Sequence, residues 1–300
     1  MSELKKIKLN KIISFKNHPF QVNNDDSMKN LVESIKTNGL LNPLIVRECG
    51  NNQFEMISGH RRKLALELNG IEEVDAYVKE LTDDEAIIYM VDSNMYREKI
   101  LPSEKAFAYK MKLDALKHQG KKMNTSTTKV SKKRTNEIVG EANGVSREQI
   151  RKYIRLTFLI PNLLELVDNT VKYDKRTYLT MGIKPAVELS YLNIDEQKLV
   201  YASITYLDLT PSHAQTIRIR ELSKNKLLNY NSLEEILLEN KGNQNDKITF
   251  NKEKIEKVLP PDLLKRDKRY IEKYIIDAIV QYNSLNKFKN DEINLLDLKV

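Results

Sequence analysis

The stretch from Met56 to Gly70 brings together residue types that can bind a phosphate. It reads MISGHRRKLALELNG, in which a glycine and a histidine precede two adjacent arginines, Arg61 and Arg62, and a helical pattern follows. The N-terminus of a helix offers backbone N–H groups without intrahelical acceptors, so it attracts anions and disfavours cations. Two arginines at this place indicate either a bound anion or side chains that only extend into water. The stretch by itself leaves both interpretations open.

A second stretch has the residue types and spacing of a DNA-reading motif. Residues 135–156, TNEIVGEANGVSREQIRKYIRL, fit a helix-turn-helix in which Gly140 allows close helix contact and Gly144 forms the turn. Ser146 would cap the second helix, and Ile150 and Tyr153 would pack it against the first. Candidate DNA contacts on this helix are Ser146, Arg147, Gln149, Arg151, Lys152 and Arg155, because such side chains hydrogen-bond base edges and phosphates.

The alternative for this region is a plain helical bundle whose arginines are only solvated. It explains Gly140 poorly, because glycine inside a helix costs about 1 kcal/mol relative to alanine. The preceding segment, Lys117–Arg134, contains seven lysines or arginines and no acid, and the net charge of the chain is +8. Lys132, Lys133 and Arg134 are therefore candidates for an arm along DNA phosphates, with a solvated linker as the alternative.

Composition excludes several other classes of site. The single cysteine, Cys49, leaves no internal disulfide and no Cys-rich zinc site. A metal-dependent nuclease is disfavoured, because the histidines show no ligand spacing; they are His18, His60, His118 and His213. No apolar run approaches the ~20 residues of a membrane span, and the first residues lack an apolar signal core. We therefore expect a cytoplasmic, nucleoid-associated protein with no membrane partner.

The elements that must position these residues begin with a small α/β domain. Residues 26–38 have a helical pattern with Asp26 or Ser27 as the cap and Gly39 as the stop. Apolar strands are expected after Pro43, over 53–59 and over 74–81, with a helix after His60. Gly59 would then lie at the carboxyl end of a strand, where open α/β sheets tend to bind ligands.

Beyond residue 82 the pattern is helical. We expect helices over 83–98 and 101–117, short helices from 135 to 222, and a C-terminal amphipathic helix near residues 269–285. The apolar face of that last helix must dock on its own domain or on a second copy. The expected division is an N-terminal domain over 1–117, a basic linker over 118–134, a helix-turn-helix domain over 135–222, a linker over 223–247 and a C-terminal segment over 248–300.

Three ordered boxes and the helix-turn-helix resemble the ParB partition proteins, especially those of plasmids and integrative elements. The family's Gly-x-x-x-Pro-aliphatic segment is similar to GLLNPLIVR (39–47), and its Gly-Glu-Arg-Arg box to GHRR (59–62). Its Glu-Asn-x-x-Arg box is similar to SNMYR (93–97), and the helical segment after the motif to residues 181–204. The resemblance, over about residues 5–222, implies an α+β chain with a ParB/sulfiredoxin-like domain and a helical DNA-binding domain. A small C-terminal segment, a candidate for dimerisation, follows.

The resemblance also implies a ligand. In this family the arginine box binds the phosphates of CTP, and nucleotide binding closes a dimer into a clamp around DNA. Carried over by position, the nucleotide-binding residues are Gly39, Pro43, Gly59, His60, Arg61, Arg62, Asn94 and Arg97. The family further implies a homodimer, a short and palindromic double-stranded DNA site and a ParA-like ATPase as partner.

Two departures from the family pattern concern the metal. His60 replaces the glutamate of the arginine box, and Ser93 replaces that of the third box. Those acids are tied to Mg²⁺ and to hydrolysis, and Mg²⁺ prefers oxygen ligands to a histidine. We therefore expect no catalytic residues and no protein metal site, hence at most a weak CTPase.

Two rival functions remain from the residues. Sulfiredoxin has a similar α/β fold but needs a nucleophilic cysteine at the arginine box, where this chain has His60. A transcriptional repressor of a mobile element could use the same helix-turn-helix without any role in partition. The sequence favours a centromere-binding partition protein and keeps the repressor as the alternative.

Overall fold

The computed structural model describes residues 2–97, 99–123, 145–173, 178–239 and 258–263, and positions 271, 274, 275, 277, 278 and 281. The chain divides into two units, Met1–Glu239 and Asn240–Val300. No helix among the described residues is both long enough and apolar enough to cross a membrane.

The first unit begins with a five-stranded sheet of order β1-β5-β3-β4-β2. Its strands are β1 (Ser2–Lys8), β2 (Ile12–Ile13), β3 (Leu44–Glu48), β4 (Phe54–Ser58) and β5 (Glu73–Lys79). β1 is antiparallel to β5, and β3 is parallel to β5 but antiparallel to β4. The sequence predicts β3, β4 and β5 but not β1 or β2. β1 has no clear strand pattern because it is a lysine-rich edge strand, and β2 contains only two residues.

Both faces of β4 are covered, so its first four residues, Phe54 to Ile57, are all buried. Met56 packs in one cluster with side chains of α1 (Asp26–Asn38) and α2 (His60–Leu68), whereas the next residue, Ile57, belongs to a cluster with α3 (Asp83–Asn94). α1 ends at Gly39 as predicted, but its cap is Asp25, whose carboxylate accepts from the backbone N–H of Met28 at 2.9 Å. The mixed α/β domain expected from the sequence is confirmed.

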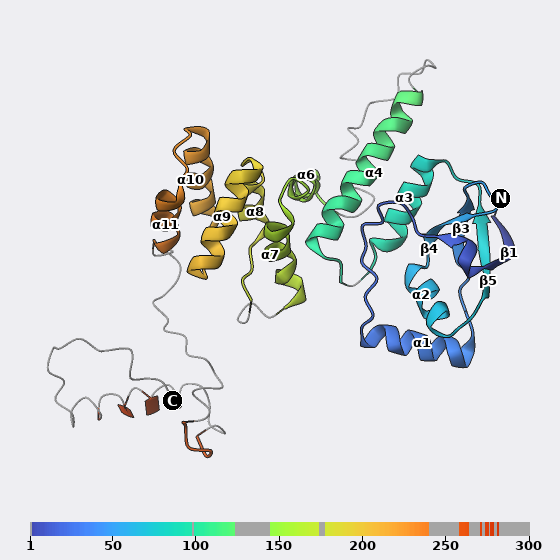
Figure 1. Ribbon diagram of the computed structural model, residues 1–300, viewed down its shortest axis with the longest axis horizontal. Helices are drawn as coiled ribbons and strands as arrows, with labels where there is room; N and C mark the ends of the chain where they lie inside the picture. The colour runs from blue at the N-terminus through green and yellow to red at the C-terminus, as the bar shows by residue number, and fades with distance from the viewer. Residues whose placement is uncertain are drawn as a thin grey trace. The chain divides into compact units, whose positions relative to one another are not determined.

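α4 (Pro102–Met123) joins the sheet domain to the helical region. It packs against α3 and also against α6 (Arg147–Leu156) and α7 (Pro161–Lys172), as Figure 1 shows. The helix continues to Met123 and so enters the segment 118–134 that the sequence marks as a linker. The described residues do not include most of that linker or the first helix of the expected helix-turn-helix. They also leave out five residues singled out in the sequence: Gly140, Gly144, Lys132, Lys133 and Arg134.

The remaining helices form one apolar core. They are α8 (Ile183–Leu189), α9 (Ile194–Leu207), α10 (His213–Lys224) and α11 (Tyr230–Leu238), and they bury side chains such as Val200, Ile219 and Leu233 together with Ile150 of α6. α11 corrects the expected linker over 223–247, because Asn229 caps a helix whose Leu233, Ile236 and Leu237 are buried. A short apolar helix between polar residues is easily taken for a linker in the sequence.

In the second unit, the six separate positions from 271 to 281 are helical, in agreement with the predicted C-terminal helix. Tyr274 is 41% exposed, and Ala278 is exposed too.

Candidate functional site

The start of α2, named here the cradle, combines a glycine N-cap with free backbone donors. Its N-cap is Gly59, whose φ of 109° lies in the left-handed region, and a Cβ there would lie 2.7 Å from Cδ2 of Leu44. No side chain caps the helix, and the first backbone donor bonded to the cap carbonyl is the N–H of Lys63, at 2.8 Å. The N–H groups of the three preceding residues begin the helix without intrahelical acceptors, so this end suits an anion.

Arg61 does not extend into water. Its Nη2 donates to Oδ1 of Asp25 at 3.2 Å and to Oγ of Ser27, both at the start of α1. Hydrogen bonds from Ser27 and from the N–H of Met28, with the charge of Arg61, hold the pKa of Asp25 below its usual value. The structure thus supplies Arg61 with an internal carboxylate, which an incoming anion would have to displace or share.

Arg62 connects the two boxes that the sequence places in one site. Its Nη1 donates to the carbonyl oxygens of Asn42 and Pro43, the latter at 2.9 Å. Burial lowers the pKa of Arg62, because neutralising a charge relieves the cost of its desolvation. Pro43 therefore belongs to this site through its carbonyl oxygen.

Two histidines meet beside the cradle. The rings of His18 and His60 lie 3.7 Å apart between centroids at an interplanar angle of 30°. Nδ1 of His18 bonds the carbonyl oxygen of Phe20 at 2.8 Å, while the Nε2 atoms of both rings are buried without a partner in the described part of the chain. Burial lowers the pKa of His18 to about 4 and that of His60 to about 3. Both imidazoles are therefore neutral at pH 7.

This pair corrects the impression of scattered histidines. His18 lies in an irregular segment and His60 at the first turn of α2, so their spacing in the chain carries no motif. Among the described residues, no group of three or more His, Cys, Asp or Glu side chains could hold a metal ion.

Arg97 approaches the cradle from the segment after α3. Burial lowers its pKa, Glu104 opposes that shift and the charge of Arg61 adds to it. The charge of Arg97 also depresses the pKa of His60, and its guanidinium lies 5.4 Å from the ring centroid of Phe20. Arg61, Arg97 and the histidine pair thus lie within electrostatic reach of one another.

Two residues expected at this site make local hydrogen bonds in the structure. Asn94 is buried, and its Nδ2 donates to the carbonyl oxygen of Met90 at 2.7 Å. Gly39 has a φ of 71° and ends α1 by donating its N–H to the carbonyl oxygen of Ile35. No described contact connects either of them to the arginines, and Ser93 likewise bonds back to Met90.

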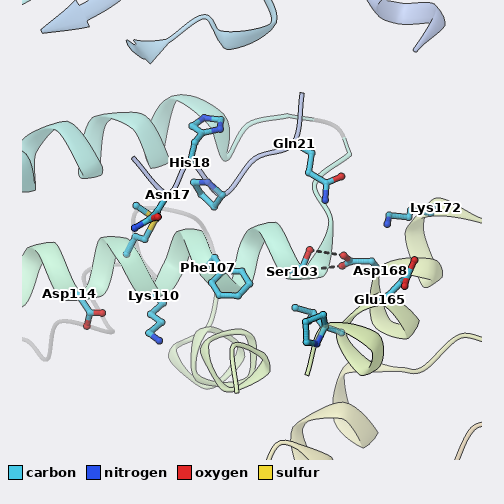
Figure 2. A pocket seen from close by; sticks show the side chains of 14 residues that line it. Asn17, His18, Gln21, Ser103, Phe107, Lys110, Asp114, Glu165, Asp168 and Lys172 are labelled. Atoms are coloured by element: carbon cyan, nitrogen blue, oxygen red, sulfur yellow. Dashed lines mark hydrogen bonds between the residues drawn. The ribbon is translucent and has the colours of Figure 1, made fainter. Parts of the chain in front are cut away.

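A groove next to this site lies between the segment 17–21, α4 and α7. It encloses about 850 Å³. Ser103 and the buried Asp168 both line it, and Figure 2 shows the N–H and Oγ of Ser103 donating to the two carboxylate oxygens of Asp168, at 2.9 and 2.6 Å. Glu104 accepts from the N–H of Gln21 at 2.7 Å. The first turn of α4 is thereby bonded to the sheet domain and to α7.

The helix that the sequence assigns to base reading is α6. Ser146 caps it, accepting from the N–H of Gln149 at 3.2 Å, and Ile150 and Tyr153 are buried as predicted. The remaining candidates differ in access: Gln149 and Arg151 are exposed, and Arg147 and Lys152 are half-buried.

Arg155, which the sequence also assigns to DNA contact, is hydrogen-bonded within the protein. Its Nε donates to Oγ of Ser190 at 2.9 Å and its Nη2 to the carbonyl oxygen of Ser190 at 2.7 Å. The side chain is therefore bound to the end of α8. No signal in the sequence separates it from Arg151, one helical turn earlier.

Comparison with known proteins gives one family match, the ParB N-terminal domain, over residues 1–95. A nucleoid occlusion protein of Geobacillus sp. (strain WCH70) is 35% identical over 107 residues, which are 36% of this chain and 38% of that protein. A probable chromosome-partitioning protein ParB of Coxiella burnetii is 30% identical over 167 residues, 56% of this chain and 52% of that protein. The matched region thus spans about half or less of these relatives.

Among solved structures, a C-terminally truncated chromosome-partitioning protein ParB from Caulobacter crescentus complexed with CTP-gamma-S is 19% identical to this chain. The alignment covers 66% of this chain and 96% of that one, with a TM-score of 0.30.

Proposed function

Because residues 1–95 match the ParB N-terminal domain, we propose that this chain is a DNA-binding partition protein whose α/β domain takes a nucleoside triphosphate. In this proposal α6 reads a short palindromic site, and two copies of the chain act together. A ParA-like ATPase is the partner that partition requires. Closure of the dimer as a clamp on DNA is the further step that nucleotide binding would control.

One observation carries the proposal: three guanidinium groups gather around an uncapped helix start. Three positive charges lie where the helix dipole is already positive, those of Arg61, Arg62 and Arg97. Burial lowers the pKa of both Arg62 and Arg97. Asp25 pairs with Arg61 and Glu104 acts on Arg97, so three guanidinium groups face two carboxylates, and a polyanion would balance the remaining positive charge. The triphosphate of CTP is the polyanion that the sequence boxes imply.

The proposed roles follow from position. The N–H groups after Gly59 and the guanidinium of Arg62 would bind phosphate oxygens, while Arg61 would leave Asp25 to do the same. His60 and Ser93 stand where the family has acids, and Asp92 is bound to Lys112. We therefore propose that CTP is bound with slow hydrolysis or none, with Mg²⁺ held mainly by the phosphates if it is bound at all.

The test is calorimetry of the full chain with CTP, with and without Mg²⁺, followed by DNA binding and crosslinking with and without CTP. The DNA site is first selected from a random duplex library. We expect CTP binding that Arg62→Ala abolishes and that the control Lys29→Ala, an exposed residue of α1, leaves intact.

The opposite outcomes are equally definite. If CTP does not bind under any of these conditions, the arginines have only a structural role. Rapid CTP hydrolysis would show that the metal site is complete without the family's acids. Failure to select any DNA sequence would remove the DNA-reading function of α6.

A further inference from the structure

The surface next to α6 carries an alternating row of cations and aromatic rings. The Nζ of Lys110 lies 5.5 Å from the ring centroid of Phe158, and the guanidinium carbon of Arg155 lies 4.5 Å from the same centroid. Arg155 also lies 3.9 Å from the centroid of Tyr191, and Arg220 lies 3.7 Å from it. This row, named here the cation–aromatic row, links α4, α6, the α8–α9 connection and α10.

The cations of the row contact rings of the protein itself. The guanidinium groups of Arg155 and Arg220 both lie over the ring of Tyr191, although Tyr191 remains 48% exposed and Phe158 54% exposed. Each of these two arginines is thereby held by an aromatic neighbour within the protein.

Arg155 is the member with the most fixed geometry. It bonds both Oγ and the carbonyl oxygen of Ser190, which is 2% exposed and whose own Oγ donates to the carbonyl oxygen of Val187. Beyond Tyr191, Nη1 of Arg220 bonds Glu188 of α8 at 2.8 Å. The planar guanidinium of Arg155 makes these hydrogen bonds and also lies over the ring of Tyr191, and a lysine ammonium cannot reproduce both contacts.

We propose that Arg155 is a positioning residue: it fixes the orientation of α6 against α8 and α10 and does not itself contact DNA. This inference rests on the proposed function, in which α6 reads base edges. Base readout needs side chains held within about 0.5 Å and 10–20° of the productive geometry. The exposed Gln149 and Arg151 obtain that precision from the rigid attachment of their helix.

The experiment compares Arg155→Lys and Arg155→Gln with Arg151→Gln, on the selected site and on random duplex DNA, over a series of salt concentrations. Both Arg155 variants are expected to weaken specific binding about tenfold, the loss of roughly one base contact. Random-DNA affinity and the salt slope should stay unchanged in both. Arg151→Gln is the matched control on the same helix, and its salt slope should fall by about 0.9 if it contacts a phosphate.

A direct phosphate contact gives a different pattern. Arg155→Lys would then keep specific affinity, and Arg155→Gln would weaken all DNA alike with a slope smaller by about 0.9; that result overturns the inference. Should an Arg155 variant fail to fold, Tyr191→Leu removes the ring from the row without changing any charge on α6. It should reproduce the tenfold loss at constant slope, and unchanged discrimination in that variant would also overturn the inference.

Failure of the two proposals can be told apart. If the unmodified chain does not discriminate its site from random DNA, the proposed function fails. If it does discriminate and Arg155→Lys discriminates equally well, only the positioning role fails.

Discussion

The close contact between His18 and His60 predicts that the first unit loses stability in mild acid. Both imidazoles are neutral in the folded protein, with pKa values of about 4 and about 3, against an ordinary value of 6.5. The unfolded chain therefore binds more protons than the folded one once the pH falls below 6.5. Because stability rises with pH wherever the unfolded state holds more protons, acid must destabilise the fold.

The magnitude follows from the same values. Between pH 7.5 and pH 5.0 each histidine protonates almost fully in the unfolded chain and little in the folded one, which costs about 2 kcal/mol per group. The sum of about 4 kcal/mol is an upper bound, because both rings keep some solvent contact and their titrations are coupled. We expect about half of it, roughly 2 kcal/mol.

The assay is urea unfolding followed by circular dichroism at pH 7.5 and 5.0. With a slope near 2 kcal/mol per molar urea, the midpoint should fall by about 1 M. His18→Asn with His60→Gln should remove most of that fall, whereas His118→Gln, on an exposed side chain, should not. An equal loss of stability in the double variant and the unmodified protein would show that other groups cause it and would refute the reasoning.

Three further predictions concern the two sites. Gly59→Ala should destabilise the first unit by about 2 kcal/mol or more in thermal unfolding, because alanine is strained at a φ of 109° and its Cβ would clash with Leu44. The control Gly70→Ala should cost less stability, because no atom lies near the added Cβ. Asp25→Asn should keep the helix cap but release Arg61, so CTP should bind severalfold more tightly in calorimetry; weaker binding would contradict the competition between Asp25 and the ligand. Gln149→Ala should weaken specific DNA binding by about 1–3 kcal/mol and spare random DNA in a binding titration.

The sequence is informative where local pattern and burial coincide. β5 alternates buried Val74, Ala76 and Val78 with outward residues, and α6 shows its cap and its two packing residues in the right register. These elements follow from periodicity and capping, which are properties of neighbouring residues. The arginine box is also local, so its place at the start of α2 is predictable.

The contacts that the sequence does not reveal join residues distant along the chain. His18 meets His60, Arg61 meets Asp25, and Arg155 bonds Ser190, each across more than 30 positions. An arginine on a polar helix face looks the same in the sequence whether it faces solvent or a serine on another helix. Only the tertiary arrangement separates Arg155 from Arg151.

The way α4 begins has a consequence for how the protein unfolds. Residues 1–95 match a recognised domain, yet Phe20 and Ile57 of that segment share a buried cluster with Ile100 and Ala108. Glu104 supplies the acceptor for the N–H of Gln21, and Asp168 supplies those for Ser103. A fragment ending at residue 95 would lose this apolar cover and the Glu104 acceptor together. The cooperative folding unit is therefore longer than the evolutionary one, and hydrogen exchange should show the sheet and α4 opening as a single event.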